Sequence, residues 1–334
     1  MRRVVSVRSA DGGFTLIELL VSLVIMGVLL AILLPAVQCA RETARRLQCG
    51  HQLKQIALAM HNYHGTHNSL PYGVNAGWGH SWSAHLLPFV EQQALADIVP
   101  WTESGWWGGN DRNSIAFRTL ARAKLTLFRC PSQGPPFTSD VNGLPGRFVT
   151  NYLACAGGDA RHDNRGAGGM DRSNGMFLAA HFDSDPKRPT RLSDVRDGTS
   201  RTLMVSESVF LLESESTCFI CDRFYLYHPD ADSRGGYDFS EALGSTFYPI
   251  NTSAVNNAER ECAFSSHHPG GVCGVHADGA TEFFNESVDL ETWRAIGSIR
   301  DHDLAPTRGR LPSAFSVCHT GSDMAARRQT RRMR

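Results

Sequence analysis

The most apolar part of the sequence is a run close to its amino terminus. From Phe14 to Val37 there are 24 residues, and Glu18 is the only charged residue among them. A helix of about 20 such residues crosses a hydrocarbon core that is about 30 Å thick. A carboxylate inside the membrane costs about 2.5–3.5 kcal/mol, so Glu18 calls for a specific partner. The pattern predicts that residues 14–37 form a membrane-spanning helix.

An amphipathic pattern continues this helix beyond the apolar run. Apolar residues recur at intervals of 4, 3, 4 and 3, which is the spacing of one helix face. They are Cys49, Leu53, Ile56, Met60 and Tyr63. Gly65 and Pro71 predict the end of the helix. We therefore expect residues 38–65 to form the extracytoplasmic half of one long stalk helix, packed through this face on a globular head.

The pattern changes after residue 66, where short apolar runs alternate with clusters of Gly, Pro, Asn and Asp. Such spacing predicts an α+β head over 66–304 that is rich in antiparallel strands. The clearest hairpin is 271–284, where the turn Asp278-Gly279 suits positive φ angles. The other expected elements are a strand at 201–209, helical segments at 80–95, 115–128 and 289–300, a surface loop at 157–175 and a flexible basic tail at 305–334.

Composition and charge narrow the classes of protein. The chain has 334 residues with 42% hydrophobic residues, and 33 Lys and Arg balance 33 Asp and Glu. This hydrophobic content is enough for a packed core and excludes a disordered chain. A net charge of zero argues against a dedicated nucleic-acid binder. Arg2, Arg3 and Arg8 precede the apolar run, so the positive-inside rule places the amino terminus in the cytoplasm.

Common amino-terminal segments do not account for this pattern. A secretory signal peptide has an apolar region of only about 7–15 residues followed by small residues at the cleavage site. A lipoprotein site at Cys39 calls for a small residue before it, but Gln38 stands there. A plain membrane anchor fits the length of the run and leaves Glu18 unexplained.

The segment Gly13-Phe14-Thr15-Leu16-Ile17-Glu18-Leu19-Leu20 resembles the type IV prepilin leader junction. The resemblance implies that prepilin peptidase cuts after Gly13, which makes residues 1–13 a leader. Phe14 then becomes the N-methylated mature terminus, and Glu18 pairs with the free amine of a neighbouring subunit. Pro35 stands where many pilins carry a proline that kinks the helix.

The rest of the chain resembles a large bacterial family of unknown function, domain 1559, over about residues 13–300. The matching stretches are 49–64, 128–132, 151–154, 197–205 and the motif His-x9-Asp-Gly, formed by His268, Asp278 and Gly279. Members join a prepilin leader to such a head, and are described as similar to the major pseudopilin of type II secretion or as solute-binding-like. The chain departs from the family pattern at Arg201, at Ser208 after Glu207, and at 273–276.

Nine cysteines are present, and a location outside the cytoplasm permits disulfides. Cys49 lies on the packed face of the stalk helix, so we predict that it pairs with a head cysteine, Cys130. Cys218 and Cys221 form a single Cys-x-x-Cys, which favours a local disulfide or two free thiols. The remaining cysteines are Cys39, Cys155, Cys262, Cys273 and Cys318.

Metal and cofactor sites are weakly indicated, and none is assigned. The candidate groups are His61, His64 and His67 at one helix end, and the loop residues Asp159, Asp163, Asn164, Asp171 and Asn174. The histidines lack the further ligands of a zinc site, and the loop spacing differs from an EF-hand. We expect no cofactor, with calcium as the alternative at the loop. His268 and Asp278 are expected to have structural roles.

No hydrolase elbow, metalloprotease motif or phosphate-binding loop is present, so we expect no enzymatic activity. The first hypothesis is a pilin-like subunit of a type II secretion or type IV pilus type assembly. Its partners are prepilin peptidase, homologous subunits and the inner membrane, with no nucleic acid, and its head is periplasmic or extracellular. The alternative is a tethered solute- or polysaccharide-binding protein with a groove of exposed tryptophans, Trp78, Trp82, Trp101, Trp106 and Trp107.

Overall fold

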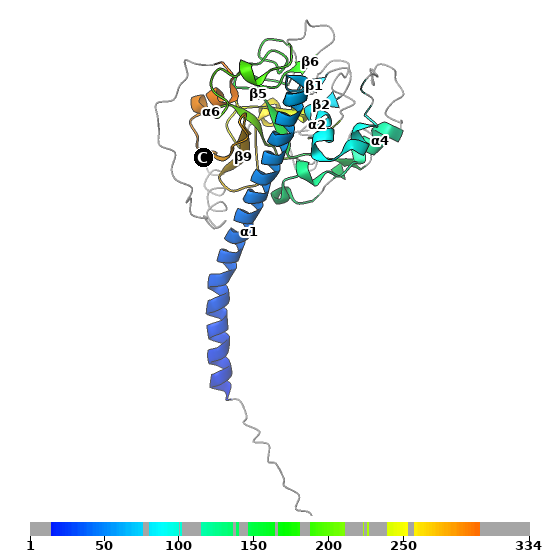
Figure 1. The fold of residues 1–334 in the computed structure, drawn as a ribbon. Helices are drawn as coiled ribbons and strands as arrows, with labels where there is room; N and C mark the ends of the chain where they lie inside the picture. Colours follow the sequence, from blue (N-terminus) through cyan, green and yellow to red (C-terminus); the bar gives the residue numbers. More distant parts are fainter. Residues whose placement is uncertain are drawn as a thin grey trace, which may run out of the picture. The chain divides into compact units, whose positions relative to one another are not determined.

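A computed structural model gives the fold, which is drawn in Figure 1. It describes residues 15–75, 80–99, 101, 115–135, 138–139, 146–163, 166–180, 188–210, 223, 226, 239–252 and 257–300. The expected leader and the basic tail lie outside these residues. Two compact units are distinguished, Met1–Ala44 with Leu311–Arg334, and Arg45–Arg310, and each is described by itself.

One long helix opens the described chain, as the apolar pattern predicted. Helix α1 (Leu16–His67) continues through Pro35, so the proline does not end it. Large apolar side chains between Leu16 and Val37 are 46–81% exposed, and this helix is long and apolar enough to cross a membrane. The expected end at Gly65 is wrong by two residues. Asn68 ends the helix in the left-handed region, with φ 53°, and donates its N–H to the carbonyl of His64.

The head contains a mixed sheet of five strands in the order β10-β9-β7-β5-β8. The strands are β5 (Tyr152–Gly157), β7 (Leu203–Glu207), β8 (Leu243–Ser245), β9 (Gly271–His276) and β10 (Thr281–Asn285). Four of them pair antiparallel, as expected, whereas β8 runs parallel to β5 at the sheet edge. A parallel pair needs a crossover connection rather than a hairpin, and short-range patterning does not reveal which strands such a connection joins.

Smaller elements surround this sheet. Two short sheets are formed by β1 (Val74–Asn75), β2 (His80–Ser81) and β6 (Ala179–Ala180), and by β3 (Thr138–Ser139) and β4 (Arg147–Phe148). The helices are α2 (Trp82–His85), α3 (Gln93–Ala96), α4 (Ile115–Arg122), α5 (Asn257–Cys262) and α6 (Leu290–Gly297). The 3₁₀ turns are η1 (Leu87–Val90), η3 (Thr126–Phe128), η4 (Pro131–Gln133), η6 (Leu192–Asp194) and η7 (Phe239–Glu241).

The predicted helical and strand segments are largely confirmed, with shifted boundaries. The expected surface loop at 157–175 is wrong in part, because many of its described residues, such as Ala160 and Met170, are buried. The segment 80–95 is broken into a strand and three short helical pieces, and 115–128 into α4 and η3. Helix α6 begins where expected, because the Asp289 carboxylate accepts a hydrogen bond from the Thr292 N–H at 2.9 Å. The hairpin 271–284 is confirmed as β9 and β10. Its turn has one positive φ, at Gly279 (86°), rather than two, because four residues connect the strands.

Strands β5, β7, β8 and β9 are buried on both faces of the sheet, whereas β10 is partly exposed. Along β5, Tyr152 and Ala154 join the hydrophobic core that also contains Leu53 of α1, while Leu153 points to a second core around Trp293 of α6. This alternation follows from the two-residue period of a strand. The expected packing of the stalk stripe on the head is therefore confirmed for the part of α1 that belongs to the head unit.

Truncation of this stripe should destabilise the head. Leu53 is fully buried, so Leu53→Ala should lower the free energy of unfolding by about 2–5 kcal/mol, through lost burial and an unfilled cavity. Leu58 lies on the same helix and is 62% exposed, so Leu58→Ala should change it by less than about 0.5 kcal/mol. Urea unfolding of the full chain in detergent measures both. Equal effects of the two substitutions would contradict this packing.

A buried histidine predicts loss of stability in acid. His80 is 1% exposed, and burial lowers its pKa to about 4. The unfolded chain takes up this proton near pH 6.5, so stability is lost as the pH falls from about 6.5 towards 4. From pH 7 to pH 5 the loss from this group is about 2 kcal/mol. Urea unfolding at both pH values should show a smaller drop in His80→Gln, and an unchanged drop would refute the assignment.

Candidate functional site

Four buried side chains from separate parts of the head converge on one point. They are Cys49 of α1, Cys130 between η3 and η4, Glu207 at the end of β7 and His268 in the loop before β9. Each residue is at most 5% exposed, and one ligand atom from each lies within 4.8 Å of the others. In the described part of the chain, this is the one such group of His, Cys, Asp and Glu side chains. We call these four residues the buried cluster.

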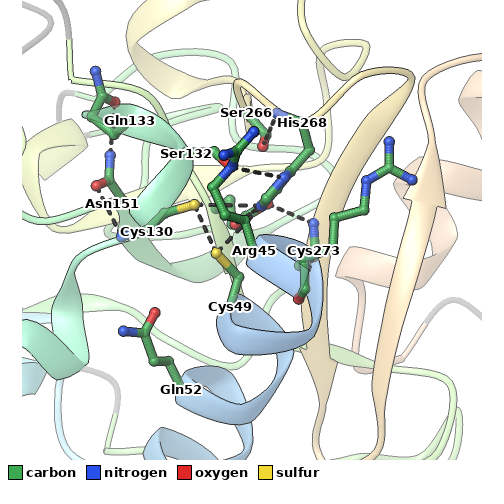
Figure 2. Close-up of polar contacts among 12 residues, drawn as sticks. Arg45, Cys49, Gln52, Cys130, Ser132, Gln133, Asn151, Ser266, His268 and Cys273 are labelled. Carbon is green, nitrogen blue, oxygen red and sulfur yellow. Dashed lines mark hydrogen bonds and ion pairs between the residues drawn. The ribbon is translucent and has the colours of Figure 1, made fainter. Parts of the chain in front are cut away.

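The imidazole of His268 is the centre of the buried cluster, as Figure 2 shows. Its Nε2 lies 3.3 Å from the Sγ of Cys49 and 3.4 Å from the Sγ of Cys130. The same atom lies 3.2 Å from the Oε1 of Glu207. Its other ring nitrogen, Nδ1, lies 3.3 Å from the hydroxyl of Ser132. One nitrogen thus faces three potential ligand atoms while the other contacts a hydroxyl.

Neighbouring groups hold these side chains in place. The second carboxylate oxygen of Glu207 accepts the backbone N–H of Cys273 at 2.8 Å. The Cys130 N–H donates to the amide oxygen of Asn151 at 3.1 Å, and Asn151 in turn donates to Gln133 (Figure 2). These hydrogen bonds orient the Glu207 carboxylate and the backbone at Cys130.

The charges in the buried cluster are mutually dependent. Burial lowers the pKa of His268, but hydrogen bonds with Cys130 and Glu207 outweigh it and raise the pKa to about 10. Burial raises the pKa of Glu207, but hydrogen bonding to His268 and its charge bring it below the usual value. The hydrogen bond from Cys49 lowers the pKa of Cys130, and the same bond raises that of Cys49. Without a bound ion, imidazolium and carboxylate therefore form a buried ion pair beside the sulfurs.

The predicted pairing of Cys49 with Cys130 stays a prediction. Their sulfurs lie 2.7 Å apart, and the structure carries both as thiols. Cys155, Cys262 and Cys273 are also buried thiols, whereas Cys39 is disulfide-bonded. The pair 218 and 221, and Cys318, lie outside the described residues.

The His-x9-Asp-Gly motif separates into two roles. His268 belongs to the buried cluster, while Asp278 and Gly279 lie at the opposite end of β9. Asp278 accepts the N–H of Ala280 at 2.9 Å, which shapes the turn, as its structural interpretation predicted. His268 has contacts well beyond local packing, so its purely structural interpretation missed the buried cluster. The sequence analysis did not predict Glu207 as a site residue. A glutamate at the end of an apolar strand is a pattern that could have indicated it.

The weaker sequence candidates do not gather into sites in the described residues. His67 stacks on Tyr63 with 4.0 Å between ring centroids, and His64 accepts the Leu192 N–H at 3.3 Å. In the loop, Asp159 accepts hydrogen bonds from Ser173 and Asn174, so its carboxylate supports the loop itself. Asn164 lies outside the described residues, and calcium binding stays untested.

The expected tryptophan groove is only partly described. Trp82 is 1% exposed and donates its indole N–H to the Ala242 carbonyl, so it belongs to the core. Trp101 is 37% exposed. Trp78, Trp106 and Trp107 lie outside the described residues.

The amino-terminal candidates form a second region, in the other compact unit. Gly13 and Phe14 lie outside the described residues. Glu18 accepts hydrogen bonds from the Thr15 N–H (2.9 Å) and hydroxyl (2.7 Å), and its own N–H donates to that hydroxyl at 3.3 Å. This reciprocal arrangement is a capping box at the start of α1. In the single chain, the Glu18 carboxylate thus satisfies the helix terminus.

Comparison with known families agrees with this architecture. Residues 8–34 match the prokaryotic N-terminal methylation motif, which supports a pilin-like protein that is processed by prepilin peptidase and assembles with pilin-like subunits. Residues 38–291 match the family described as a protein of unknown function, DUF1559. The chain belongs to this family. No curated protein and no solved structure matches the chain.

Proposed function

We propose that this protein is a non-enzymatic pseudopilin, a structural subunit of a type II secretion or type IV pilus type assembly. The observation that carries the proposal is the methylation motif, with Glu18 at the start of an exposed apolar helix that runs on into the head. A helix of this kind serves both as a membrane anchor before assembly and as the contact between subunits afterwards.

The position of Glu18 supports assembly over simple anchoring. In the single chain its carboxylate accepts hydrogen bonds from Thr15, which would leave the charge of this acid without a cation in the membrane. A neighbouring Phe14 amine, released by cleavage after Gly13, would supply that cation. We infer that the subunit is held in the inner membrane with its amino terminus in the cytoplasm and its head outside.

A membrane-tethered binding protein is the competing function. It needs a membrane helix and a ligand groove, but neither the methylation motif nor Glu18. Of the tryptophans expected in the groove, Trp82 is buried in the core, and Trp101 is the one exposed member among the described residues.

Sedimentation of the native protein separates these functions. Cells are sheared, and the sheared surface material and the membrane fraction are each probed for the mature protein. A subunit of an assembly should sediment with sheared filaments, or cross-link to its neighbours through the helix in the membrane fraction. A protein that stays monomeric in the membrane, without helix-to-helix cross-links, would refute assembly and favour the tethered binding protein.

A further inference from the structure

We propose that the buried cluster binds one Zn²⁺ through Cys49, Cys130, Glu207 and His268. The proposal goes beyond assembly and does not depend on it, since all four residues lie in the head unit. The site would be a structural metal centre, because four protein ligands leave no open coordination position.

The separations around His268 suit a tetrahedral ion. With metal–ligand bonds of about 2.0–2.3 Å, nitrogen lies roughly 3.4–3.6 Å from neighbouring sulfur or oxygen ligands. The observed distances from Nε2 are 3.3 and 3.4 Å to the sulfurs and 3.2 Å to the carboxylate. These contacts are hydrogen bonds in the absence of an ion, and their lengths are also close to the edges of a coordination tetrahedron. The two sulfurs, at 2.7 Å, would move apart by about 1 Å to reach their edge.

The outer contacts are those of a metal centre. A ligating histidine usually contacts a polar group through its other ring nitrogen, which orients the ring. Here Nδ1 faces the Ser132 hydroxyl, which also accepts a hydrogen bond from Arg45 Nε at 3.2 Å. Glu207 is anchored through one oxygen by the Cys273 N–H, while its Oε1 faces His268 Nε2 at 3.2 Å and the residue is 1% exposed. That oxygen is directed at the centre of the buried cluster.

The chemical types of the four ligand atoms indicate which metal ion the buried cluster would bind. Thiolates favour soft or borderline metals, imidazole suits zinc, and hard cations such as calcium prefer oxygen ligands alone. Two thiolates, one imidazole and one carboxylate in a closed buried site match zinc. With thiolate ligands and Zn²⁺ the centre retains one negative charge, and Arg45 approaches it through Ser132.

A zinc ion here would fasten the stalk helix to the head. Cys49 lies on α1, and the other ligands come from three segments that are distant in the sequence. Because binding requires all four segments to be in place, the free energy of metal binding would stabilise this arrangement.

A Cys49–Cys130 disulfide is the competing state. It would consume both thiols and exclude the metal, and the observed 2.7 Å lies between a disulfide bond of about 2.05 Å and two zinc thiolates at about 3.8 Å. A disulfide would join the two cysteines and leave the Glu207 carboxylate and the His268 imidazole as a buried ion pair. Such a pair has a high desolvation cost. Zinc gives each of the four groups a ligand role.

The decisive measurement is the state of the full-length protein isolated in detergent without chelator or reductant. We expect one zinc per chain by elemental analysis, and no Cys49–Cys130 disulfide by non-reducing peptide mapping after alkylation in denaturant. Isolation with that disulfide and without zinc would overturn the proposal, whatever the reduced protein binds afterwards.

Cobalt substitution tests the ligands. The Co²⁺-loaded full chain should show tetrahedral d–d bands and thiolate charge-transfer absorption equivalent to two sulfurs. Cys49→Ser should lower that absorption by about half or abolish binding. Cys155→Ser is the matched control, because Cys155 is an equally buried thiol in the other core, and it should leave zinc content and spectrum unchanged. An octahedral spectrum of the wild-type protein would overturn the ligand assignment. Equal changes of the spectrum in Cys49→Ser and Cys155→Ser would also overturn it.

Discussion

In cells that contain prepilin peptidase, Gly13→Leu should accumulate almost entirely as precursor, while the wild-type protein is mature. The peptidase is expected to cut between Gly13 and Phe14, and a residue without a side chain at this position lets the backbone approach the catalytic groups closely. Mass analysis of the membrane fraction measures both forms.

The matched control is Gly12→Leu, which places the same side chain one residue upstream. It should be processed, with Phe14 as the mature terminus. The processing assignment fails if Gly13→Leu is cut normally, or if the wild-type mature terminus is a residue other than Phe14.

The second large effect concerns assembly. Glu18→Ala should still insert into the membrane, because removing the charge makes the span more apolar. It should be nearly absent from sheared filaments, because the Phe14 amine of a neighbouring subunit is left without its carboxylate inside the bilayer. Co-sedimentation with sheared surface material, beside a membrane-fraction control, measures the loss.

Two further variants separate the charge from its local role. Glu18→Gln keeps an oxygen that can accept the hydrogen bonds of the capping box, but it carries no charge, so assembly should be lost as in Glu18→Ala. Ser22 lies one turn further along the helix and donates its hydroxyl to the Glu18 carbonyl. Ser22→Ala removes that hydroxyl and should assemble normally. Normal sedimentation of Glu18→Gln would mean that Glu18 serves only the helix start, and would favour the tethered binding protein. All variants must show the mature terminus, so that a processing defect is not mistaken for an assembly defect.

Several features of this protein follow from neighbouring residues alone. The apolar run, the stripe from Cys49 to Tyr63 and the hairpin at Asp278-Gly279 are local patterns with the periods of a helix or a strand. The structure confirms a long helix, a buried stripe and that hairpin. The end of α1 was less accurate, because Asn68 rather than Gly65 adopts the left-handed conformation.

Only the tertiary structure decided which distant residues meet. The sequence paired Cys49 with Cys130, because Cys49 lies on the packed face of the stalk helix. It grouped His268 with Asp278 in one motif, although the two residues lie beyond opposite ends of β9. The sheet order places the end of β7 next to the start of β9, and thereby brings Glu207 to His268. The hydrophobic pattern of the sequence also did not predict the parallel pairing of β8 with β5. The spacing of hydrophobic residues specifies which face of a helix or strand is buried. The element that packs against this face depends on how the chain connects distant segments, and these connections leave no periodic pattern in the sequence.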